Sequence, residues 1–352
     1  MSARLSILIS ALFWGLLVIP APAFAASLYT GEALLDAGET ATGPSLRALD
    51  EVLVRLTGIT DRSLIEELGL GSGDLRLLVS SEQRIRRQRP DRETGGMVDE
   101  LRLKVDFDAQ AVDRLLARHD LPRLGRERPA ILLWLAVEGG NWDGDGHDLS
   151  LSADPAFEHA VVEHGRRLGL DVIRPLGDLM DLSELEPFDI RGGFLDSAVP
   201  SARRYGAGMI AMLDLRRSDE GWLGRWFWRL EDRDDGRQLQ AETAEEILAA
   251  GLEYILSALA ERFAVAAGVT ESGQRRVRIT GVADEVQYVE ILRYLEGLGA
   301  VADVRVTGAR GREVELEPNL SSPGFEDALA IGGVLAVEQR LADGGLVLRL
   351  LR

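Results

Sequence analysis

An acidic, glycine-rich stretch at residues 141–148 holds the side chains best suited to binding a cation. Counting from Asp143, oxygen ligands fall at Asp143 and Asp145, and Asp154 takes the twelfth place of a calcium-binding loop. Calcium prefers such clustered carboxylate oxygens. However, His147 stands where an oxygen ligand is usual, and the sixth place lacks the glycine that turns the chain. The spacing favours an acidic surface hairpin, with Asp143, Asp145 and Asp154 as candidate metal ligands.

A second metal pattern falls on the helix predicted over Phe157–Leu168, which carries His159, Glu163 and His164. The pattern is one residue longer than the H-x-x-E-H zinc signature. Because each helical residue turns the chain by about 100°, the two histidines lie about 140° apart and cannot share one metal. Cysteine is absent, so thiol nucleophiles and cysteine-ligated metals are excluded. We therefore expect solvated helix side chains, no catalytic residue assignable from sequence, and no cofactor.

Three tryptophans lie on the strand predicted over Gly221–Glu231 and share one face of it. Such an aromatic stripe could bind glycan rings or a partner peptide. Alternatively, it packs beneath the long helix predicted over Ala244–Ala267, which needs a sheet to cover. The core position is the favoured alternative. Trp222, Trp226 and Trp228 are nevertheless the candidate partner-binding residues of the sequence.

The first 25 residues have the organisation of a secretory signal peptide. Arg4 is followed by an apolar run over residues 5–19, a break at Pro20 and a small-residue pattern that ends at Ala25. The run is shorter than the roughly 20 residues that span a bilayer comfortably. An uncleaved anchor is the alternative. We expect cleavage near Ala25, a periplasmic location and no stable membrane span after processing.

The composition is that of an ordinary globular protein. The chain has 352 residues, of which 46% are hydrophobic and 28% charged, which argues against extensive disorder. The formal net charge is −18. Because nucleic-acid binding depends on neutralising phosphates, this charge predicts no nucleic-acid partner.

Hydrophobic periodicity divides the rest of the chain into three small mixed modules of the α+β or α/β class. The predicted domains are an N-terminal α+β domain over 27–125, a central α/β domain over 126–269 and a C-terminal domain over 275–352. The C-terminal domain follows a ferredoxin-like βαββαβ order. In it, residues 334–339 form the last strand of that order and residues 346–350 form an extra edge strand.

Two local expectations are specific enough to test. In the N-terminal domain, residues 74–89 are predicted to be a single strand that pairs with residues 98–108. In the central domain, Asp234-Asp235-Gly236 is predicted to be the turn that joins two strands.

Several fragments of the sequence form a recognisable pattern, namely residues 28–33, 52–58, 105–108, 121–122, 128–129, 202–207 and 222–228. Together they resemble the proteobacterial envelope family called domain of unknown function 2066. The resemblance extends over most of the chain after the predicted signal peptide, although Met212-Leu213-Asp214-Leu215 departs from the small-Gly-Arg-Leu strand of the family. The resemblance implies an uncharacterised periplasmic protein, and it carries over no catalytic residue because the family has no assigned activity.

The sequence therefore predicts an exported periplasmic accessory or binding protein without enzymatic activity, which engages an envelope protein or a cell-wall component. Two alternatives stay open, namely a hydrolase acting on envelope glycan or peptide and a calcium or small-ligand binding protein. A cleft that unites carboxylates with perturbed pKa values would favour the hydrolase. An exposed patch containing the tryptophans would favour partner binding.

Overall fold

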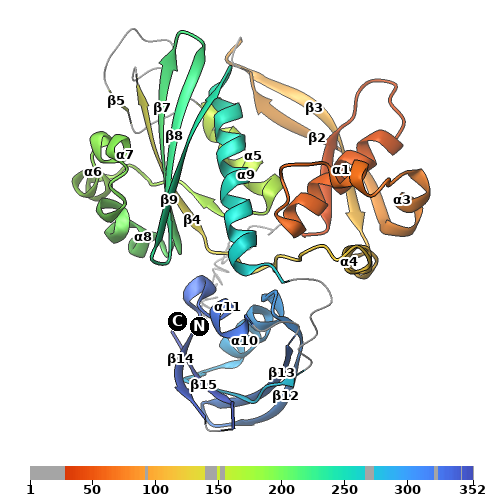
Figure 1. Ribbon diagram of the computed structural model, residues 1–352, viewed down its shortest axis with the longest axis vertical. Helices are drawn as coiled ribbons and strands as arrows, with labels where there is room; N and C mark the ends of the chain where they lie inside the picture. The colour runs from red at the N-terminus through yellow and green to blue at the C-terminus, as the bar shows by residue number, and fades with distance from the viewer. Residues whose placement is uncertain are drawn as a thin grey trace, which may run out of the picture.

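The computed structural model of the protein describes residues 28–91, 94–138, 149–150, 155–265, 273–320, 324–341 and 343–351. The described ranges contain eleven α-helices and fifteen strands, and the strands form three separate sheets (Figure 1). This confirms the mixed α+β class. The predicted signal peptide lies outside the described residues. Among the described helices, none combines the length and apolar character that a membrane crossing requires.

The first sheet is antiparallel, with strand order β1-β3-β2. Its strands are β1 (Thr30–Leu34), β2 (Val79–Pro90) and β3 (Met97–Phe107). The helices that accompany it are α1 (Thr42–Thr57), α2 (Leu64–Glu67), α3 (Ser72–Leu78) and α4 (Ala109–Arg118). Helix α1 buries its apolar face in the core of this unit and ends at Gly58, which adopts the left-handed conformation that favours glycine.

Helix α3 corrects the prediction of one long strand over residues 74–89. The helix begins after Gly71, whose backbone N–H donates a 2.9 Å hydrogen bond to the Asp74 carboxylate. Leu75 and Leu78 are buried at a helical spacing of three residues. The strand β2 starts only at Val79. The capped first turn therefore makes residues 72–78 helical, although the sequence that follows them favours a strand.

The central sheet has the strand order β5-β4-β7-β8-β9, with β6 pairing to β4. Its strands are β4 (Ile131–Glu138), β5 (Leu149–Ser150), β6 (Val172–Ile173), β7 (Met209–Ser218), β8 (Gly221–Leu230) and β9 (Arg233–Ala241). Strands β4 and β7 run parallel and are buried over most of their length, as the continuous apolar runs predict.

Helices cover both faces of this central sheet (Figure 1). One face packs against α5 (Pro155–Leu168) and α9 (Ala244–Phe263). The other face is covered by α6 (Leu179–Glu184), α7 (Pro187–Gly192), a 3-10 turn at Leu195–Ala198 and α8 (Val199–Tyr205). Two separate apolar clusters result, one on each side of β4 and β7.

The turn between β8 and β9 is displaced from its predicted position. Leu230 pairs with Arg233, so the turn consists of Glu231 and Asp232 and not of residues 234–236. Gly236 lies within β9, where a Cβ atom would stand 2.8 Å from the carbonyl oxygen of Trp226. The glycine is therefore used for a close approach of two backbones, which its sequence neighbourhood does not distinguish from a turn.

The third sheet contains β10 (Gly273–Gln274), β11 (Val277–Thr280), β12 (Val301–Arg310), β13 (Glu313–Leu320), β14 (Leu335–Arg340) and β15 (Leu346–Leu350). Strand β13 pairs with both β12 and β11, and β15 pairs with β11 and β14. Helices α10 (Glu285–Gly297) and α11 (Phe325–Ala328) belong to the same unit. Figure 1 shows this unit below the other two.

The last two strands exchange the places predicted for them. Strand β15 was expected at the edge, yet it lies inside the sheet and pairs parallel with β11. Strand β14 occupies the edge instead. Leu346 and Leu348 of β15 are fully buried, whereas β14 ends in three exposed polar residues, so burial of the more apolar strand decides the order. The detailed ferredoxin-like arrangement is thus not confirmed.

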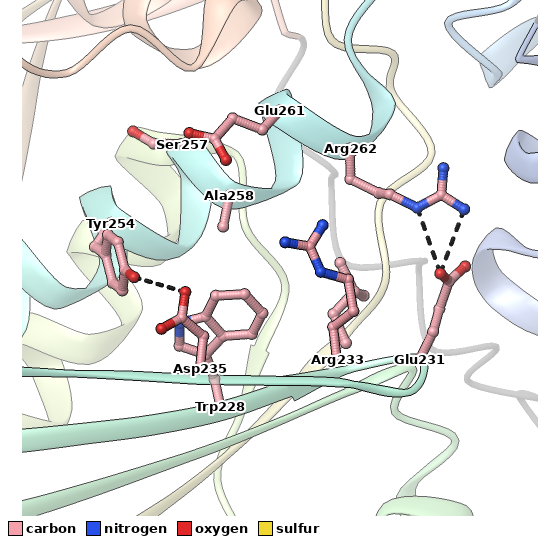
Figure 2. Close-up of a pocket in the computed structure, with 10 residues that line it drawn as sticks. Trp228, Glu231, Arg233, Asp235, Tyr254, Ser257, Ala258, Glu261 and Arg262 are labelled. Atoms are coloured by element: carbon pink, nitrogen blue, oxygen red, sulfur yellow. Dashed lines mark hydrogen bonds and ion pairs between the residues drawn. The ribbon is translucent and has the colours of Figure 1, made fainter.

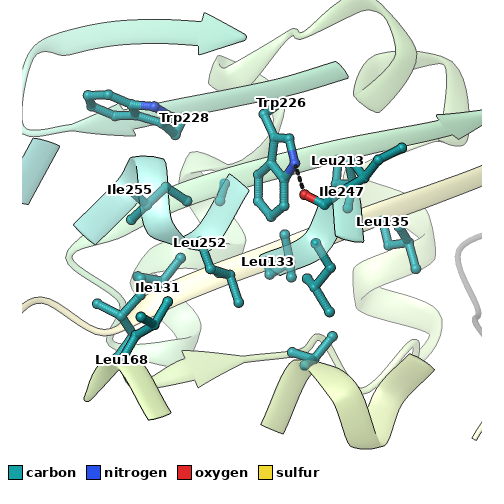
Figure 3. Packing of buried hydrophobic residues seen from close by; sticks show 14 of the residues in the cluster. Ile131, Leu133, Leu135, Leu168, Leu213, Trp226, Trp228, Ile247, Leu252 and Ile255 are labelled. Atoms are coloured by element: carbon teal, nitrogen blue, oxygen red, sulfur yellow. Dashed lines mark hydrogen bonds between the residues drawn. The ribbon is translucent and has the colours of Figure 1, made fainter. Parts of the chain in front are cut away.

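The tightest packing in the central core lies between Trp226 and Gly251. The indole N–H of Trp226 donates a 3.3 Å hydrogen bond to the carbonyl oxygen of Ile247, and the ring lies directly against α9 (Figure 3). A Cβ atom on Gly251 would stand 2.0 Å from the ring of Trp226. Helix α9 therefore needs a glycine at this turn in order to approach the sheet.

We predict that Gly251→Ala lowers the free energy of unfolding by about 1–3 kcal/mol, the usual cost of overpacking a core. Urea unfolding followed by tryptophan fluorescence measures the change. The matched control is Gly73→Ala in α3, where a Cβ atom meets nothing within 4 Å. Equal stability of the Gly251 variant and the wild type would contradict the packing described here.

Candidate binding cleft between the first two units

A buried arginine joins the first unit to the central one. The side chain of Arg55, on α1, is fully buried. Its guanidinium donates hydrogen bonds to the carbonyl oxygens of Thr30 at 2.8 Å and Arg167 at 2.9 Å, and to the Glu51 carboxylate at 2.5 Å. The acceptors belong to β1, α5 and α1, so one cation holds three elements together.

A second arginine, Arg128, completes the junction from the segment before β4. It donates hydrogen bonds to the carbonyl oxygen of Arg55 at 2.6 Å and to those of Leu168 and Gly169 at 2.8 and 3.1 Å. Burial, reinforced by the charge of Arg55, lowers the pKa of Arg128 to about 9, so the side chain stays charged at neutral pH. The end of α5 is thus fixed against α1. We call Arg55 and Arg128 the arginine clasp.

Helix α9 closes the junction from the other side. The Ser257 hydroxyl donates a 3.0 Å hydrogen bond to the carbonyl oxygen of Gly58 and lies 3.1 Å from the hydroxyl of Thr60. A Cβ atom on Gly58 would stand 2.2 Å from the Cβ atom of Ala260. Small residues therefore let α9 touch the end of α1.

A cleft of about 710 Å³ lies where α1, α2, α5 and α9 meet. This volume falls within the range of small-molecule sites, which often occur between domains. Its apolar wall is formed by Leu46, Val54, Ile65 and Leu168. Its carboxylates are Glu32, Asp50, Glu51, Asp61, Glu66 and Glu253, and its arginines are Arg47, Arg62 and Arg167.

The three arginines of the cleft are each neutralised by a carboxylate. Arg47 pairs with Glu39 at 2.9 Å, and Arg62 pairs with Glu67 at 2.5 Å. Arg167 pairs with Glu253 at 2.7 Å. Four of the six carboxylates also take part in ion pairs, whereas Asp50 and Glu66 have none within the described chain.

Two of the carboxylates serve the junction itself. Glu51 is bound by Arg55, and its pKa is raised because burial outweighs the attraction of Arg55 and Arg166. Burial also acts on Glu32, but hydrogen bonds from Arg87 and the charge of Arg166 prevail and lower its pKa. Both groups are engaged in ion pairs and are not free to bind a ligand.

Asp50 differs from its neighbours in the cleft. Its carboxylate accepts a hydrogen bond from the Ser63 hydroxyl at 3.4 Å, and no arginine of the described chain lies within ion-pairing distance. Burial raises the pKa of Asp50, and this effect is offset only in part by the hydrogen bonds from Ser63 and the backbone of Ile65 and by the charge of Arg167. A cation placed here would stabilise the ionised form, so Asp50 is suited to bind one.

The sequence did not point to this cleft, although it held one signal. Arg55 follows Ala48 and Val52 at intervals of four and three residues, on the apolar face of the predicted helix. A charged residue on such a face indicates a buried, paired cation. The identity of its partners depends on the tertiary structure.

The tryptophans proposed as partner-binding residues are in the core. Trp222, Trp226 and Trp228 are 4%, 1% and 4% exposed and pack beneath α9. The prediction that they could bind a glycan or a peptide is therefore wrong, because α9 covers the sheet and buries all three tryptophans. The alternative of core packing is the one found.

The predicted metal ligands receive no support. Asp143, Asp145 and Asp154 lie outside the described residues, so the calcium loop stays a prediction. Across the described ranges, no three histidine or carboxylate side chains gather closely enough to hold a metal ion. This finding includes His159 and His164 on α5.

A smaller pocket lies between α9 and the β8–β9 hairpin (Figure 2). Trp228 contributes to its wall, Tyr254 donates a 2.8 Å hydrogen bond to Asp235, and Arg262 donates to Glu231. Its volume is about 120 Å³. Since most ligand sites are at least about 300 Å³, the cleft beside Asp50 is the better candidate.

Comparison with known proteins adds no assignment, because no family model, no curated protein and no solved structure matches the chain. The resemblance to the envelope family stays a prediction.

We predict that Arg55→Gln destabilises the protein by about 3–5 kcal/mol, since it removes the 2.5 Å ion pair of the buried Glu51 and leaves only Arg166 at 3.8 Å. The control is Arg47→Gln on the same helix, a half-exposed arginine whose loss should cost about 0–1 kcal/mol. Chemical unfolding of both variants measures the difference. A similar cost for the two would show that the clasp does not hold the units together.

His164, on α5, makes stability depend on pH. Burial, with the charge of Arg167, lowers its pKa from 6.5 to about 4. Between these two values the His164 imidazole binds a proton in the unfolded chain but not in the folded chain. The free energy of unfolding therefore falls as the pH drops from about 6.5 towards about 4. We predict that His164→Gln removes up to ~3 kcal/mol of this loss.

Urea unfolding at several pH values measures this effect as the difference between variant and wild type, which cancels the titration of the carboxylates. His159→Gln on the same helix is the control. A pH-independent difference between wild type and the His164 variant would contradict the prediction.

Proposed function

We propose that the protein is an exported, non-enzymatic binding protein of the bacterial periplasm, whose cleft holds an envelope ligand that carries a primary amine on an aliphatic chain. The observation that carries the proposal is the half-buried Asp50 carboxylate, which faces a ligand-sized cleft without an arginine partner. A lysine-type side chain of a cell-wall peptide belongs to this ligand class.

The walls of the cleft match both ends of such a ligand. An ammonium group is a compact donor that a carboxylate binds strongly when water is partly excluded. The aliphatic chain that carries it packs well on an apolar surface, which Leu46, Val54 and Ile65 supply beside Asp50. The carboxylates of Asp50 and Glu66, which have no ion pair within the described chain, also attract cations and repel anions.

The periplasmic location in this proposal depends on the signal-peptide organisation of residues 1–25 and on the resemblance to the envelope family. The proposal that the protein has no enzymatic activity depends on how the carboxylates of the cleft are held. Catalysis by paired carboxylates requires both groups to reach the substrate, and Glu51 is held by Arg55.

A hydrolase is the second candidate, because the cleft unites Asp50 and Glu51, both with raised pKa values. Perturbed carboxylates in a cleft are typical of catalytic sites. However, Asp50 and Glu51 are consecutive residues of helix α1, so their side chains point about 100° apart. Ser63 is engaged as the N-cap of α2, where its hydroxyl accepts a hydrogen bond from the backbone of Glu66. Binding without turnover is therefore the better proposal.

We predict that the protein binds the capped peptide Ala-Lys-Ala and discriminates against the same peptide with acetylated lysine by roughly tenfold, the value of one charge-assisted contact. Asp50→Asn should abolish the discrimination. Isothermal titration calorimetry measures both affinities, and mass spectrometry of the recovered peptide reports any cleavage.

Asp61→Asn is the matched control, because Asp61 lines the same cleft but is exposed and paired with Arg62. It should leave the discrimination unchanged. Equal binding of the two peptides by the wild type would refute the amine site, and cleavage that requires Asp50 would favour the hydrolase.

A further inference from the structure

Helix α6 has its apolar and charged faces reversed. Its inward residue is Asp181, which is fully buried and accepts hydrogen bonds from the Tyr205 hydroxyl at 2.7 Å and the Gly177 backbone at 2.9 Å. Arg204 adds an ion pair at 3.0 Å. Meanwhile Leu179 is 86% exposed, and Met180 and Leu182 are more than half exposed. Polar contacts hold the helix in place and leave its apolar side chains outside.

Further apolar residues are exposed before and after this helix in the chain. Leu176 precedes it, Phe188 projects from α7, and Phe194 follows α7 with its ring against Gly192. These three side chains are also more than half exposed. Six large apolar residues of one short segment are thus exposed, and Figure 1 shows that α6 and α7 lie on the outer side of the central sheet. We call this set the α6–α7 surface. Such an accumulation is typical of interaction sites, whereas single exposed residues are ordinary.

The charges around the α6–α7 surface select its partner. Residues 176–198 contain six carboxylates and a single arginine, Arg191. Of these carboxylates, Asp181 is buried and Asp196 is paired with Arg229. That arginine is engaged by Glu138 and Asp214 and turns towards the sheet. Asp178 is paired with Arg204, but Glu186 and Asp189 have no ion pair within the described chain. The rim of the apolar surface is therefore acidic.

We infer that the α6–α7 surface docks a basic amphipathic segment of another protein, with apolar anchors flanked by lysine or arginine. A second copy of this chain would bring together two acidic rims on molecules of net charge −18. An anionic lipid surface would be repelled in the same way. A basic partner covers the apolar side chains and neutralises their rim at once. This inference does not depend on the amine site, which lies on other elements.

The experiment uses the full chain and a synthetic helix with leucines on one face and lysines on the other, followed by fluorescence anisotropy. We expect saturable binding that weakens roughly tenfold in the double variant Leu179→Ser/Phe188→Ser, which removes two anchors. The control is Leu77→Ser, a residue of α3 that is 77% exposed and lies on another unit. It should bind as the wild type does. Glu186→Lys should weaken binding, and so should salt raised from about 50 to about 300 mM.

Four outcomes would overturn the inference. The double variant and the Leu77 control could bind the helix equally, or the same helix with glutamates in place of lysines could bind as well. Sedimentation could reveal a dimer that the double variant abolishes, which would make the occupant a second copy. Vesicles of phosphatidylglycerol could bind the wild type but not the double variant. Because all the variants keep Asp50, binding of the lysine peptide reports separately on the amine site.

Discussion

The arginine clasp is the contact on which the arrangement of the first two units depends. Arg55 is fully buried and Arg128 is largely buried, and backbone carbonyls take up most of their donors. Burying cations is costly unless their hydrogen bonds are satisfied. The clasp meets this condition only when β1, α1 and α5 are all in place, so the junction forms as a whole or not at all.

The cleft follows from this junction. Once α5 and α9 are fixed against α1, the outward half of α1 faces a space that neither unit fills, and its carboxylates are partly desolvated there. Glu51 is ion-paired with Arg55 of the clasp, whereas Asp50, one residue earlier, lines the cleft without an ion pair to an arginine of the described chain. The same constraint thus supplies, from adjacent positions, a structural carboxylate and the carboxylate proposed to bind the ligand.

The two faces of the central sheet have different roles. On one side α9 covers the tryptophan stripe and builds an apolar core of ordinary kind. On the other side the short helices pack through Leu185, Ile190 and Leu195, but α6 is held by Asp181 and leaves its apolar residues outside. This reversed polarity is the observation on which the inferred docking of a partner depends.

The sequence by itself determined most elements and the mixed α+β class, because periodic burial and helix caps act within a few residues. The end of α1 at Gly58 and the buried strand β4 are examples. Only the tertiary structure decided the order of β14 and β15, the core position of the tryptophans, and the meeting of Asp50 with α5 and α9. These depend on contacts between residues far apart in the chain, where burial of one segment competes with burial of another, and no local pattern records the outcome of that competition.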